Sequence, residues 1–358
     1  MTQFDFDLFV IGGGSGGVRA ARMAGQRGAR VALAECAELG GTCVNVGCVP
    51  KKLYSYAAGY AASFAEAPGY GWTLPEAPRF DWDTLKRQRA QEIKRLNGVY
   101  QKLLDGAGVT TMQGWAQLQD AHTVTVGEQR HTARHVLVAT GGMPFVPDMP
   151  GRDLAVVSDA MFDLPTFPRR LLVMGGGYIG CEFASVFRGL GAEVTLVNRG
   201  AHILNGFDDD VREFLAREMG RHGIDLRMTA QVETLRREAD GLVAMLSRGQ
   251  QIEADTVLVA TGRRPNTAGL GLEAAGVKLD SRGAIEVDAQ YRSSVPSVLA
   301  IGDVSSRLAL TPVALAEAMV VVDELFGDGQ RHRRQRQSAA DIADGQHRRH
   351  AAAVLRID

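Results

Sequence analysis

The sequence has few of the features that mark secreted, membrane-spanning or nucleic-acid-binding proteins. Four cysteines among 358 residues are too few for a secreted disulfide scaffold. The formal net charge of −1 argues against general nucleic-acid binding, which requires a strong basic excess. The N-terminus does not have the basic and then apolar pattern of a signal peptide. These absences predict a cytoplasmic protein.

The sequence also has no uncharged apolar run of the roughly 20 residues that a membrane span requires. Its most apolar late stretch, residues 308–326, contains Glu317, Asp323 and Glu324, and this pattern predicts a buried helix instead. Apolar residues make up 45% and charged residues 23% of the chain, as in an ordinary soluble protein. The length suits two or three domains, since domains commonly have about 100–200 residues.

The sequence does contain an internal repeat, a pattern of strand, loop, helix and strand that occurs twice. Each copy consists of an apolar strand, a glycine-rich loop, a helix and a second strand: 7–11, 12–17, up to about 28 and 31–35 in the first repeat, and 171–174, 175–180, up to about 191 and 194–198 in the second. Glu35 lies 23 positions after Gly12, and Asn198 lies 23 positions after Gly175. The two repeats therefore align without a gap.

Both loops match the Gly-x-Gly-x-x-Gly fingerprint in its required setting, after a strand and before a helix. The first glycine permits a tight turn, the second lets the backbone approach a pyrophosphate, and the third lets helix and strand pack closely. The pyrophosphate then binds at the positive N-terminal end of the helix. One match could be a glycine-rich turn in an unrelated α/β sheet. Two matches at the same spacing predict an α/β fold with two Rossmann-like dinucleotide-binding domains and doubly wound parallel sheets.

Three further apolar strands end in small residues. The strands within 135–141 and 256–262 end in Ala-Thr-Gly, and the strand within 297–303 ends in Gly-Asp. Ligands of such sheets bind beyond the carboxyl ends of the strands, so we expect all three ends to face dinucleotides. The proline-rich segment 143–151 is interpreted as a linker. The expected organisation is a first domain at 1–148, a second at 149–282, a return to the first at 283–329, and an atypical tail at 330–358.

The residue at the end of each second strand indicates which nucleotide binds. An acidic residue there accepts hydrogen bonds from free ribose hydroxyls, and the first repeat has Glu35. The second repeat has neutral Asn198 followed by Arg199, and an arginine can pair with a 2′-phosphate. Arg199 could also be an ordinary surface charge. We expect an adenine nucleotide with a free ribose in the first repeat and a preference for NADP over NAD in the second.

Cys43 and Cys48 lie in a glycine-rich segment just after the first repeat. They could bind zinc, although the sequence offers no second pair or suitable histidine cluster that would complete four ligands. They could also be inert core thiols. A position at the start of a helix, with lysines at 51–52, favours reactive thiolates and therefore a redox-active pair. Cys36 and Cys181 have no partner at a useful spacing and are interpreted as structural.

From about residue 4 to 329 the chain resembles the flavoprotein disulfide reductases, and among them most closely the glutathione reductases. Four segments carry the resemblance: Gly-Gly-Thr-Cys-Val-Asn-Val-Gly-Cys-Val-Pro-Lys-Lys at 40–52, Gly-Gly-Gly-Tyr-Ile-Gly-Cys-Glu at 175–182, Ala-Thr-Gly-Arg-Arg-Pro-Asn-Thr at 260–267, and Gly-Asp at 302–303 with Leu-Thr-Pro-Val-Ala at 310–314. The resemblance implies FAD in the first domain, NADPH in the second, and an enzyme that reduces glutathione disulfide with NADPH.

The resemblance also implies roles for individual residues. The residues expected to bind FAD are Gly12, Gly14, Ser15, Gly16, Gly17, Glu35, Thr42, Cys43, Lys51, Ala116, Thr140, Gly141, Asp303 and Thr311. The residues expected to bind NADPH are Gly175, Gly177, Ile179, Gly180, Glu182, Arg199, Gly262 and Arg263. In catalysis, Cys48 would lie next to the flavin, Cys43 would attack the substrate, Lys51 would pair with Glu182, and Tyr178 would cover the flavin until nicotinamide binds.

The resemblance places Arg22 and Tyr100 at the substrate, and Arg19 adds positive charge on the same helix face, one turn before Arg22. Two positions depart from the family pattern. Asn205 stands where a second basic residue usually binds the 2′-phosphate, and Met319 stands where some members have an arginine that contacts glutathione. No metal site is expected.

After about Gly329 the resemblance stops, where family members continue into a dimerisation domain that completes the partner subunit's active site. Residues 331–358 contain seven arginines and no aromatic residue, and we expect a frameshifted or truncated, disordered end. Interface surface is expected to be exposed at Leu315, Val320, Val321 and Val322. Three hypotheses follow: a glutathione-disulfide reductase impaired by truncation, a flavoprotein with dye-reductase activity only, and a reductase for another low-molecular-weight disulfide.

Overall fold

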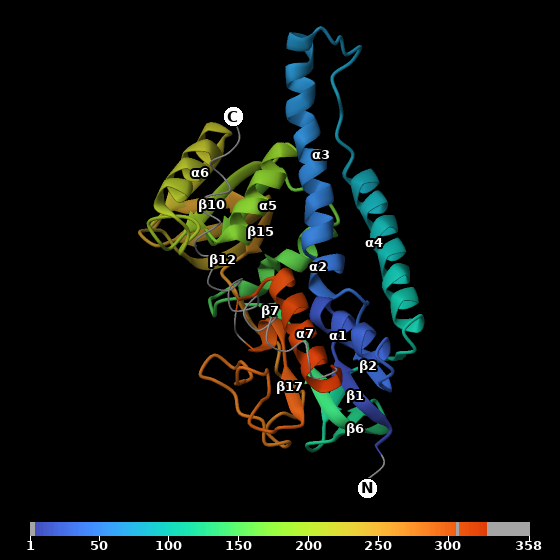
Figure 1. Ribbon diagram of the computed structural model, residues 1–358. Helices are drawn as coiled ribbons and strands as arrows, with labels where there is room; N and C mark the ends of the chain where they lie inside the picture. Colours follow the sequence, from blue (N-terminus) through green and yellow to red (C-terminus); the bar gives the residue numbers. More distant parts are fainter. Residues whose placement is uncertain (1–3, 306–307, 328–358) are drawn as a thin grey trace. The chain divides into compact units, whose positions relative to one another are not determined.

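The computed structural model describes residues 4–305 and 308–327, which divide into two units (Figure 1). The first unit takes the described residues up to Asn45, Lys94–Met143 and those from Arg264 onward, and the second takes Val46–Ile93 and Pro144–Arg263. Strands β7 (Gly142–Pro144) and β16 (Arg263–Pro265) lie where the chain passes between the units. Helix α4 (Trp82–Asp105) is divided after Ile93. The domain boundaries expected from the sequence remain predictions, and the tail at 330–358 lies outside the described residues.

A seven-stranded sheet forms the centre of the first unit, in the order β3-β2-β1-β6-β5-β4, with β17 paired to β6. Its strands are β1 (Phe6–Ile11), β2 (Val31–Glu35), β3 (Thr110–Gln113), β4 (Ala116–Leu118), β5 (Thr123–Val126), β6 (Gln129–Val138) and β17 (Val298–Ala300). The pairs of β1 with β2 and β6, of β2 with β3 and of β17 with β6 are parallel, and β4–β5 and β5–β6 are antiparallel.

The two faces of this sheet belong to two apolar clusters. Leu8 and Val10 of β1 pack in one cluster with the helices, whereas Phe9 and Ile11 pack in the other. This alternation follows from the period of two along a strand, and it explains why a strand buried on both faces is apolar throughout. The helices and the short turn of the unit are α1 (Ser15–Gly25), α2 (Gly41–Asn45), η4 (Gly302–Ser305) and α7 (Thr311–Phe326).

Helix α7 packs on α1 and buries part of the surface that the sequence led us to expect on the outside. Val321 and Val322 are fully buried in the cluster that contains Val18 and Ala21 of α1. The expectation of exposure was therefore wrong for these two valines, because their apolar side chains are covered within the unit itself. Leu315 is 37% exposed.

The second unit repeats the parallel arrangement, in the order β11-β10-β9-β15-β8. These strands are β8 (Val156–Val157), β9 (Arg170–Met174), β10 (Glu193–Asn198), β11 (Ile224–Met228) and β15 (Thr256–Val259). A separate antiparallel sheet has the order β12-β13-β14, with β12 (Val232–Glu238), β13 (Gly241–Leu246) and β14 (Gln251–Ala254). The predicted α/β fold with two Rossmann-like parallel sheets is confirmed.

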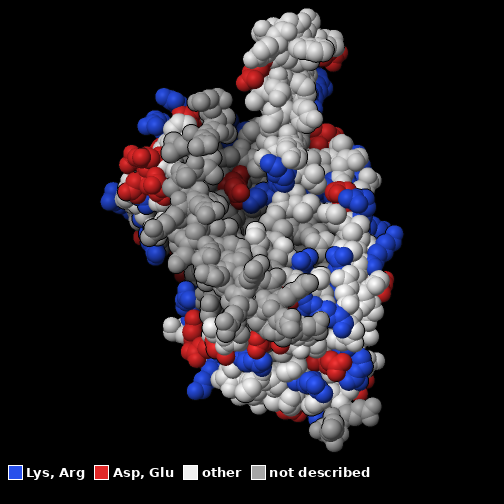
Figure 2. Space-filling model, in the orientation of Figure 1, with Lys and Arg blue, Asp and Glu red and all other residues white. Residues whose placement is uncertain are grey.

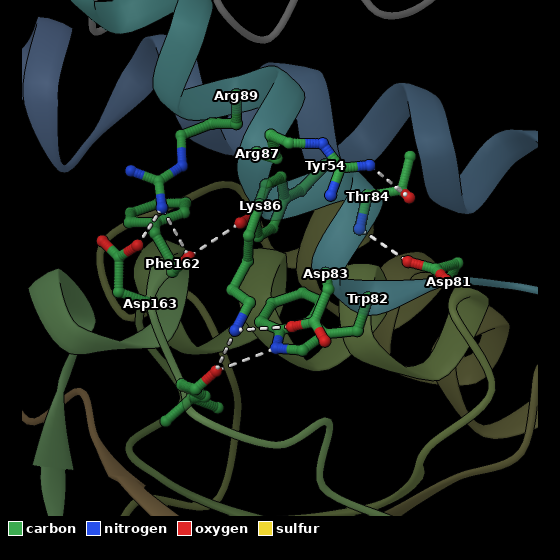
Figure 3. Close-up of polar contacts among 11 residues, drawn as sticks. Tyr54, Asp81, Trp82, Asp83, Thr84, Lys86, Arg87, Arg89, Phe162 and Asp163 are labelled. Carbon is green, nitrogen blue, oxygen red and sulfur yellow. Dashed lines mark hydrogen bonds and ion pairs between the residues drawn. The ribbon is translucent and has the colours of Figure 1, made fainter.

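The helices of the second unit are α3 (Cys48–Glu66), α5 (Tyr178–Gly189) and α6 (Asp209–Arg221), with short turns η1 (Ala67–Tyr70), η2 (Arg152–Leu154) and η3 (Ser158–Phe162). Side chains of α3 and α4 hold the end of η3 (Figure 3). Tyr54 Oη and Arg89 Nη2 each donate to the carbonyl of Phe162 at 2.8 Å. Trp82 Nε1 donates to the carbonyl of Leu164 at 2.9 Å. These contacts fix the base of α3 to the segment ahead of β9.

The outer part of α3 carries no charge over residues 53–64, and Figure 2 shows the upper part of this arm largely white. Aromatic side chains are exposed along it, with Tyr56 at 59% and Tyr60 at 63%. Tyr70 and Trp72, which follow, are 82% and 70% exposed. Residues 53–64 of α3 therefore present exposed aromatic side chains without a charged residue among them.

Candidate functional site

The first glycine loop has the geometry of a dinucleotide cradle. Gly12 has a φ of +106°, and a Cβ at this position would lie 2.6 Å from the carbonyl oxygen of Ala139. A Cβ on Gly17 would overlap the carbonyl of Gly12, so the third glycine of the fingerprint cannot be replaced without moving the loop. Around Gly14, by contrast, the space is open, since a Cβ there would meet only the Cα of Gly41 at 3.8 Å. Helix α1 begins at Ser15, and its N-terminal amides suit a pyrophosphate.

Glu35 closes this loop from the end of β2. Its Oε2 accepts a hydrogen bond from the amide of Gly13 at 2.6 Å, and its Oε1 accepts one from Ala37 at 2.8 Å. The amide of Gly40 donates to the carbonyl of Gly13 at 2.8 Å. The residue predicted to bind the ribose is therefore held beside the pyrophosphate loop, and the segment that leads to Cys43 is bonded to the same loop.

The ends of β6 and β17 lie beside each other, because these strands pair in parallel. Thr140 follows β6, and its Oγ1 donates to the carbonyl of Asn266 at 2.7 Å. Asp303 lies in η4 directly after β17, and a Cβ on Gly142 would lie 3.3 Å from the Cβ of Asp303. The structure therefore brings together the Ala-Thr-Gly and Gly-Asp strand ends. Of the other predicted FAD residues, half-buried Gly141 follows Thr140, buried Ala116 begins β4, exposed Thr42 lies in α2 and half-buried Thr311 begins α7.

Glu317 is a residue of this site that the sequence reasoning missed. It is 2% exposed on α7, and its Oε2 accepts a hydrogen bond from the amide of Gly302 at 2.7 Å. The bond fixes the turn that carries Asp303. The available signal was the position of Glu317 among apolar residues in the first half of α7, since buried carboxylates are almost always bonded.

The second loop repeats the geometry of the first. Gly175 has a φ of +113°, and a Cβ there would overlap the carbonyl of Ala260. A Cβ on Gly180 would overlap the carbonyl of Gly175. Nothing lies within 4 Å of a Cβ built on Gly177, which leaves the open space that a pyrophosphate needs. The glycine spacing thus fits a second dinucleotide.

Asn198 occupies the position of Glu35 in the second unit. Its Oδ1 accepts a hydrogen bond from the amide of Gly176 at 3.1 Å, and its Nδ2 donates to the carbonyl of His202 at 2.9 Å. Arg199 and Asn205, close in sequence, are exposed. The other residues predicted to bind NADPH are half-buried Ile179 on α5, exposed Gly262 with a φ of +135°, and half-buried Arg263 at the start of β16.

Cys43 and Cys48 lie in different local environments. Cys43 is half-buried in α2 of the first unit. Cys48 is exposed at the first position of the 19-residue helix α3 in the second unit, and the positive end of a helix favours a thiolate.

Three residues predicted to act with these cysteines lie together in the second unit. Lys51, in the first turn of α3, forms an ion pair with Glu182 of α5. The Lys51 ammonium also lies 6.0 Å from the ring centroid of Tyr178. Tyr178 is 45% exposed, so its ring is open to solvent at the start of α5. The ammonium group of Lys51, paired with Glu182, therefore lies near the exposed ring of Tyr178 at the N-terminus of α5.

The predicted substrate residues lie on two helices of the first unit. Arg19 and Arg22 are half-buried on α1, where Arg19 Nε donates to Met319 Sδ at 3.3 Å. Arg22 Nε is buried without a hydrogen-bond partner among the described residues. Burial and, to a smaller extent, the negative charge of the Cys43 thiolate raise the pKa of Tyr100. Tyr100 is thus close enough to Cys43 to be affected by its charge.

The two remaining cysteines are held as thiols. Burial, with a smaller contribution from Glu182, raises the pKa of Cys181 to about 11. Burial and the neighbouring charge of Glu35 also raise the pKa of Cys36. Thiolates are the reactive form, so these environments suit structural roles. Across residues 4–305 and 308–327, no three metal-ligating side chains cluster, and no described helix is long and apolar enough to span a membrane.

Comparison with known proteins agrees with this geometry. Residues 6–318 match the family model of the pyridine nucleotide-disulphide oxidoreductases. The chain belongs to this family. It is 49% identical over 327 residues to a glutathione reductase of Burkholderia cepacia, covering 91% of this chain and 73% of that protein. It is 43% identical to the chloroplastic/mitochondrial glutathione reductase of Pisum sativum, covering 90% of this chain and 61% of the relative.

A solved structure is also similar, that of the Cu(II) complex of the HOCl-induced flavoprotein disulfide reductase RclA from Escherichia coli. The TM-score is 0.81 at 28% identity, over 90% of this chain and 72% of that one. The protein is therefore a flavoprotein oxidoreductase of the disulfide-reductase type, and the cofactors predicted from its sequence, FAD and NADPH, are confirmed. The glycine loops described above are of the form that these dinucleotides require.

Proposed function

We propose that this chain reduces glutathione disulfide with NADPH through Cys43 and Cys48. The observation that carries the proposal is the anchoring of the cysteine segment: the amide of Gly40 is bonded to the carbonyl of Gly13, 2.8 Å away, in the loop suited to FAD. A redox-active thiol beside a flavin loop is what electron transfer to a disulfide requires. The similarity to two glutathione reductases supports glutathione as the substrate.

Bound FAD and NADPH would supply the hydride-transfer chemistry that reduces the cysteine pair. The residues of the chain would then carry out thiol exchange. The Cys43 thiolate attacks one sulfur of glutathione disulfide, forms a mixed disulfide and releases one glutathione thiolate. The Cys48 thiolate attacks the Cys43 sulfur, which releases the second glutathione thiolate and restores the Cys43–Cys48 disulfide. Both released thiolates take up a proton.

Other side chains have supporting roles in this proposal. Lys51, held by Glu182, provides positive charge close in sequence to Cys48, and Tyr178 would cover the bound flavin until nicotinamide binds. Arg19, Arg22 and Tyr100 are proposed to bind the glutathione moieties, whose carboxylates suit guanidinium groups. Arg199 is proposed to pair with the 2′-phosphate of NADPH. The assignments of the glycines, Glu35, Thr42, Thr140, Asp303 and Thr311 to FAD are proposals of the same kind.

Purified chain of confirmed mass would be assayed for NADPH oxidation with and without glutathione disulfide. Oxidation should depend on the disulfide, and Cys43→Ser and Cys48→Ser should each abolish it while Cys36→Ser, the matched control, retains it. Disulfide-dependent turnover that survives in Cys43→Ser would contradict the proposal.

A second candidate is a reductase for another low-molecular-weight disulfide, favoured by Met319 at a position where some family members have a glutathione-contacting arginine. Faster turnover with such a disulfide than with glutathione disulfide would select it. Reduction of a dye with no disulfide turnover would select a flavoprotein with dye-reductase activity only. A cytoplasmic location, the oligomeric state and the impairment expected from the tail stay predictions.

A further inference from the structure

Two asparagine side chains close the segment that carries Cys43. Asn97 of α4 donates from Nδ2 to the carbonyl of Leu39 and to Oδ1 of Asn45, each at 2.8 Å. Asn45 in turn donates from Nδ2 to the carbonyls of Glu38, Leu39 and Gly41, at 3.2, 3.2 and 3.0 Å. All of these residues belong to the first unit. Five side-chain hydrogen bonds thus hold the turn between β2 and the end of α2.

The chemistry of the acceptors fixes both amide orientations. A carbonyl oxygen can only accept, so Asn97 must present its nitrogen to Leu39. The second N–H of that nitrogen then faces Asn45, which must present its oxygen. The nitrogen of Asn45 is thereby directed at the three carbonyls of the turn. Backbone carbonyls thus orient both amides, and the bond from Asn97 Nδ2 to Asn45 Oδ1 ties the turn to α4.

The other side of the turn is fixed to the FAD loop. Gly40 donates to the carbonyl of Gly13, and a Cβ on Gly41, which has a φ of +60°, would lie 2.6 Å from the Cα of Gly14. Cys43 therefore lies between an anchor on the flavin loop and an anchor on α4. The second anchor depends on the side chain of Asn97, which lies outside the turn.

We infer that Asn97 is a positioning residue for the Cys43 thiol, an inference that rests on the proposed function. Asn97 lies three residues before Tyr100, on the same face of α4, and Tyr100 is close enough to Cys43 to feel its charge. Helix α4 therefore carries Asn97, which holds the turn around Cys43, and Tyr100, whose pKa the charge of Cys43 helps to raise. Loss of the two Asn97 bonds would free the turn on the α4 side and lower the effective concentration of Cys43 toward Cys48.

The test measures the thiol–disulfide equilibrium of the Cys43–Cys48 pair directly, without turnover. The wild-type protein, Asn97→Ala and Asn97→Gln would be equilibrated in glutathione redox buffers, quenched by alkylation and analysed by peptide mass spectrometry. Misplacement by about 1 Å can cost about 100-fold, so we expect Asn97→Ala to shift the midpoint at least about tenfold toward the dithiol. Asn97→Gln, which keeps the amide donors, should shift it less. Gln91→Ala, at an exposed position of the same helix, is the matched control and should leave it unchanged.

Flavin content and melting temperature would verify that each variant is folded, and Asn97→Ser would replace Asn97→Ala if the latter does not fold. A midpoint in both Asn97→Ala and Asn97→Gln equal to that of the wild-type protein would overturn the inference. In the turnover assay Asn97→Ala should lower kcat and leave KM for the disulfide unchanged. If the wild-type protein does not reduce glutathione disulfide, the proposed function fails, whereas the equilibrium shift still decides the role of Asn97.

Discussion

The two glycine loops of this protein have the same geometry, but the side chain that closes each loop from the second strand differs. In the first unit the amide of Gly12 donates to the carbonyl of Ala34 at 2.8 Å, and in the second the amide of Gly175 donates to that of Val197 at 2.8 Å. Ala139 and Ala260 occupy equivalent places. The amide of Ala139 donates to the carbonyl of Ile11, which ends β1, and the amide of Ala260 donates to that of Met174, which ends β9, each at 2.8 Å. The shared geometry therefore reflects the packing of loop, strand and helix.

The difference lies at the end of the second strand. Glu35 presents a carboxylate to Gly13 and accepts only, whereas Asn198 accepts from Gly176 and also donates to the loop beyond it. A carboxylate favours a free ribose and repels a phosphate, and an amide does neither. The comparison predicts that the glycines permit a dinucleotide to bind and that the neighbouring side chain selects which one.

The largest expected effect comes from adding one methyl group to the last glycine of the Gly-x-Gly-x-x-Gly fingerprint, Gly17 in the first loop and Gly180 in the second. Gly17→Ala should remove bound FAD, and Gly180→Ala should leave the flavin bound while weakening NADPH, because each Cβ overlaps the carbonyl at the start of its own loop. Overpacking of this kind costs about 1–3 kcal/mol. Flavin absorbance and the NADPH concentration that half-saturates flavin reduction would measure the two effects. Gly220→Ala, whose Cβ has nothing within 4 Å, is the control, and equal loss of FAD in both loop variants would break the comparison.

An effect of at most the same size should follow from exchanging the side chains that are expected to select the nucleotide, at positions 198, 199 and 205. Arg199→Ala should narrow the preference for NADPH over NADH, Asn205→Arg should widen it, and Asn198→Glu should reverse it by giving the second loop the carboxylate of the first. Hydrogen bonds to charged groups are worth about 1.5–3 kcal/mol, or about 10- to 150-fold in the ratio of flavin reduction rates. Equal rates with both nucleotides in the wild-type protein would contradict the assignment.

The last comparison concerns stability at low pH. It contrasts the residues at one position of two equivalent strands, β6 in the first unit and β15 in the second. His135 and Thr256 both lie four positions before the alanine of Ala-Thr-Gly. Burial, assisted by Arg292, lowers the pKa of His135 from 6.5 to about 4. The unfolded chain then binds the proton more strongly, so the free energy of unfolding should fall as the pH drops from about 6.5 to about 4. His135→Thr should make the melting temperature less dependent on pH over this range, whereas His202→Thr, at an exposed site, should leave the dependence unchanged. The same dependence on pH in His135→Thr as in the wild-type protein would contradict the prediction.

The glycine loops and the strand ends could be predicted from the sequence because they depend on local spacing and on positions that only glycine can occupy. The assignment of FAD and NADPH to the two loops came from the resemblance to the flavoprotein disulfide reductases. Contacts between segments that are distant in the chain could not be predicted from the sequence. The hydrogen bond of Glu317 to Gly302 and the contact of Tyr54 with Phe162 join residues 15 and 108 positions apart, and no period of the sequence indicates them. Val321 and Val322 were expected on the surface because the sequence of α7 does not reveal which of its faces another helix covers.

The direct test of the central claim is the number and position of the thiols that NADPH generates. The purified protein would be mixed anaerobically with one equivalent of NADPH, alkylated and analysed by peptide mass spectrometry. The account predicts that two thiols appear per chain, at Cys43 and Cys48, while Cys36 and Cys181 are alkylated, if at all, to the same extent before and after NADPH. New thiols at Cys36 or Cys181, or none with a flavin that NADPH does reduce, would contradict it.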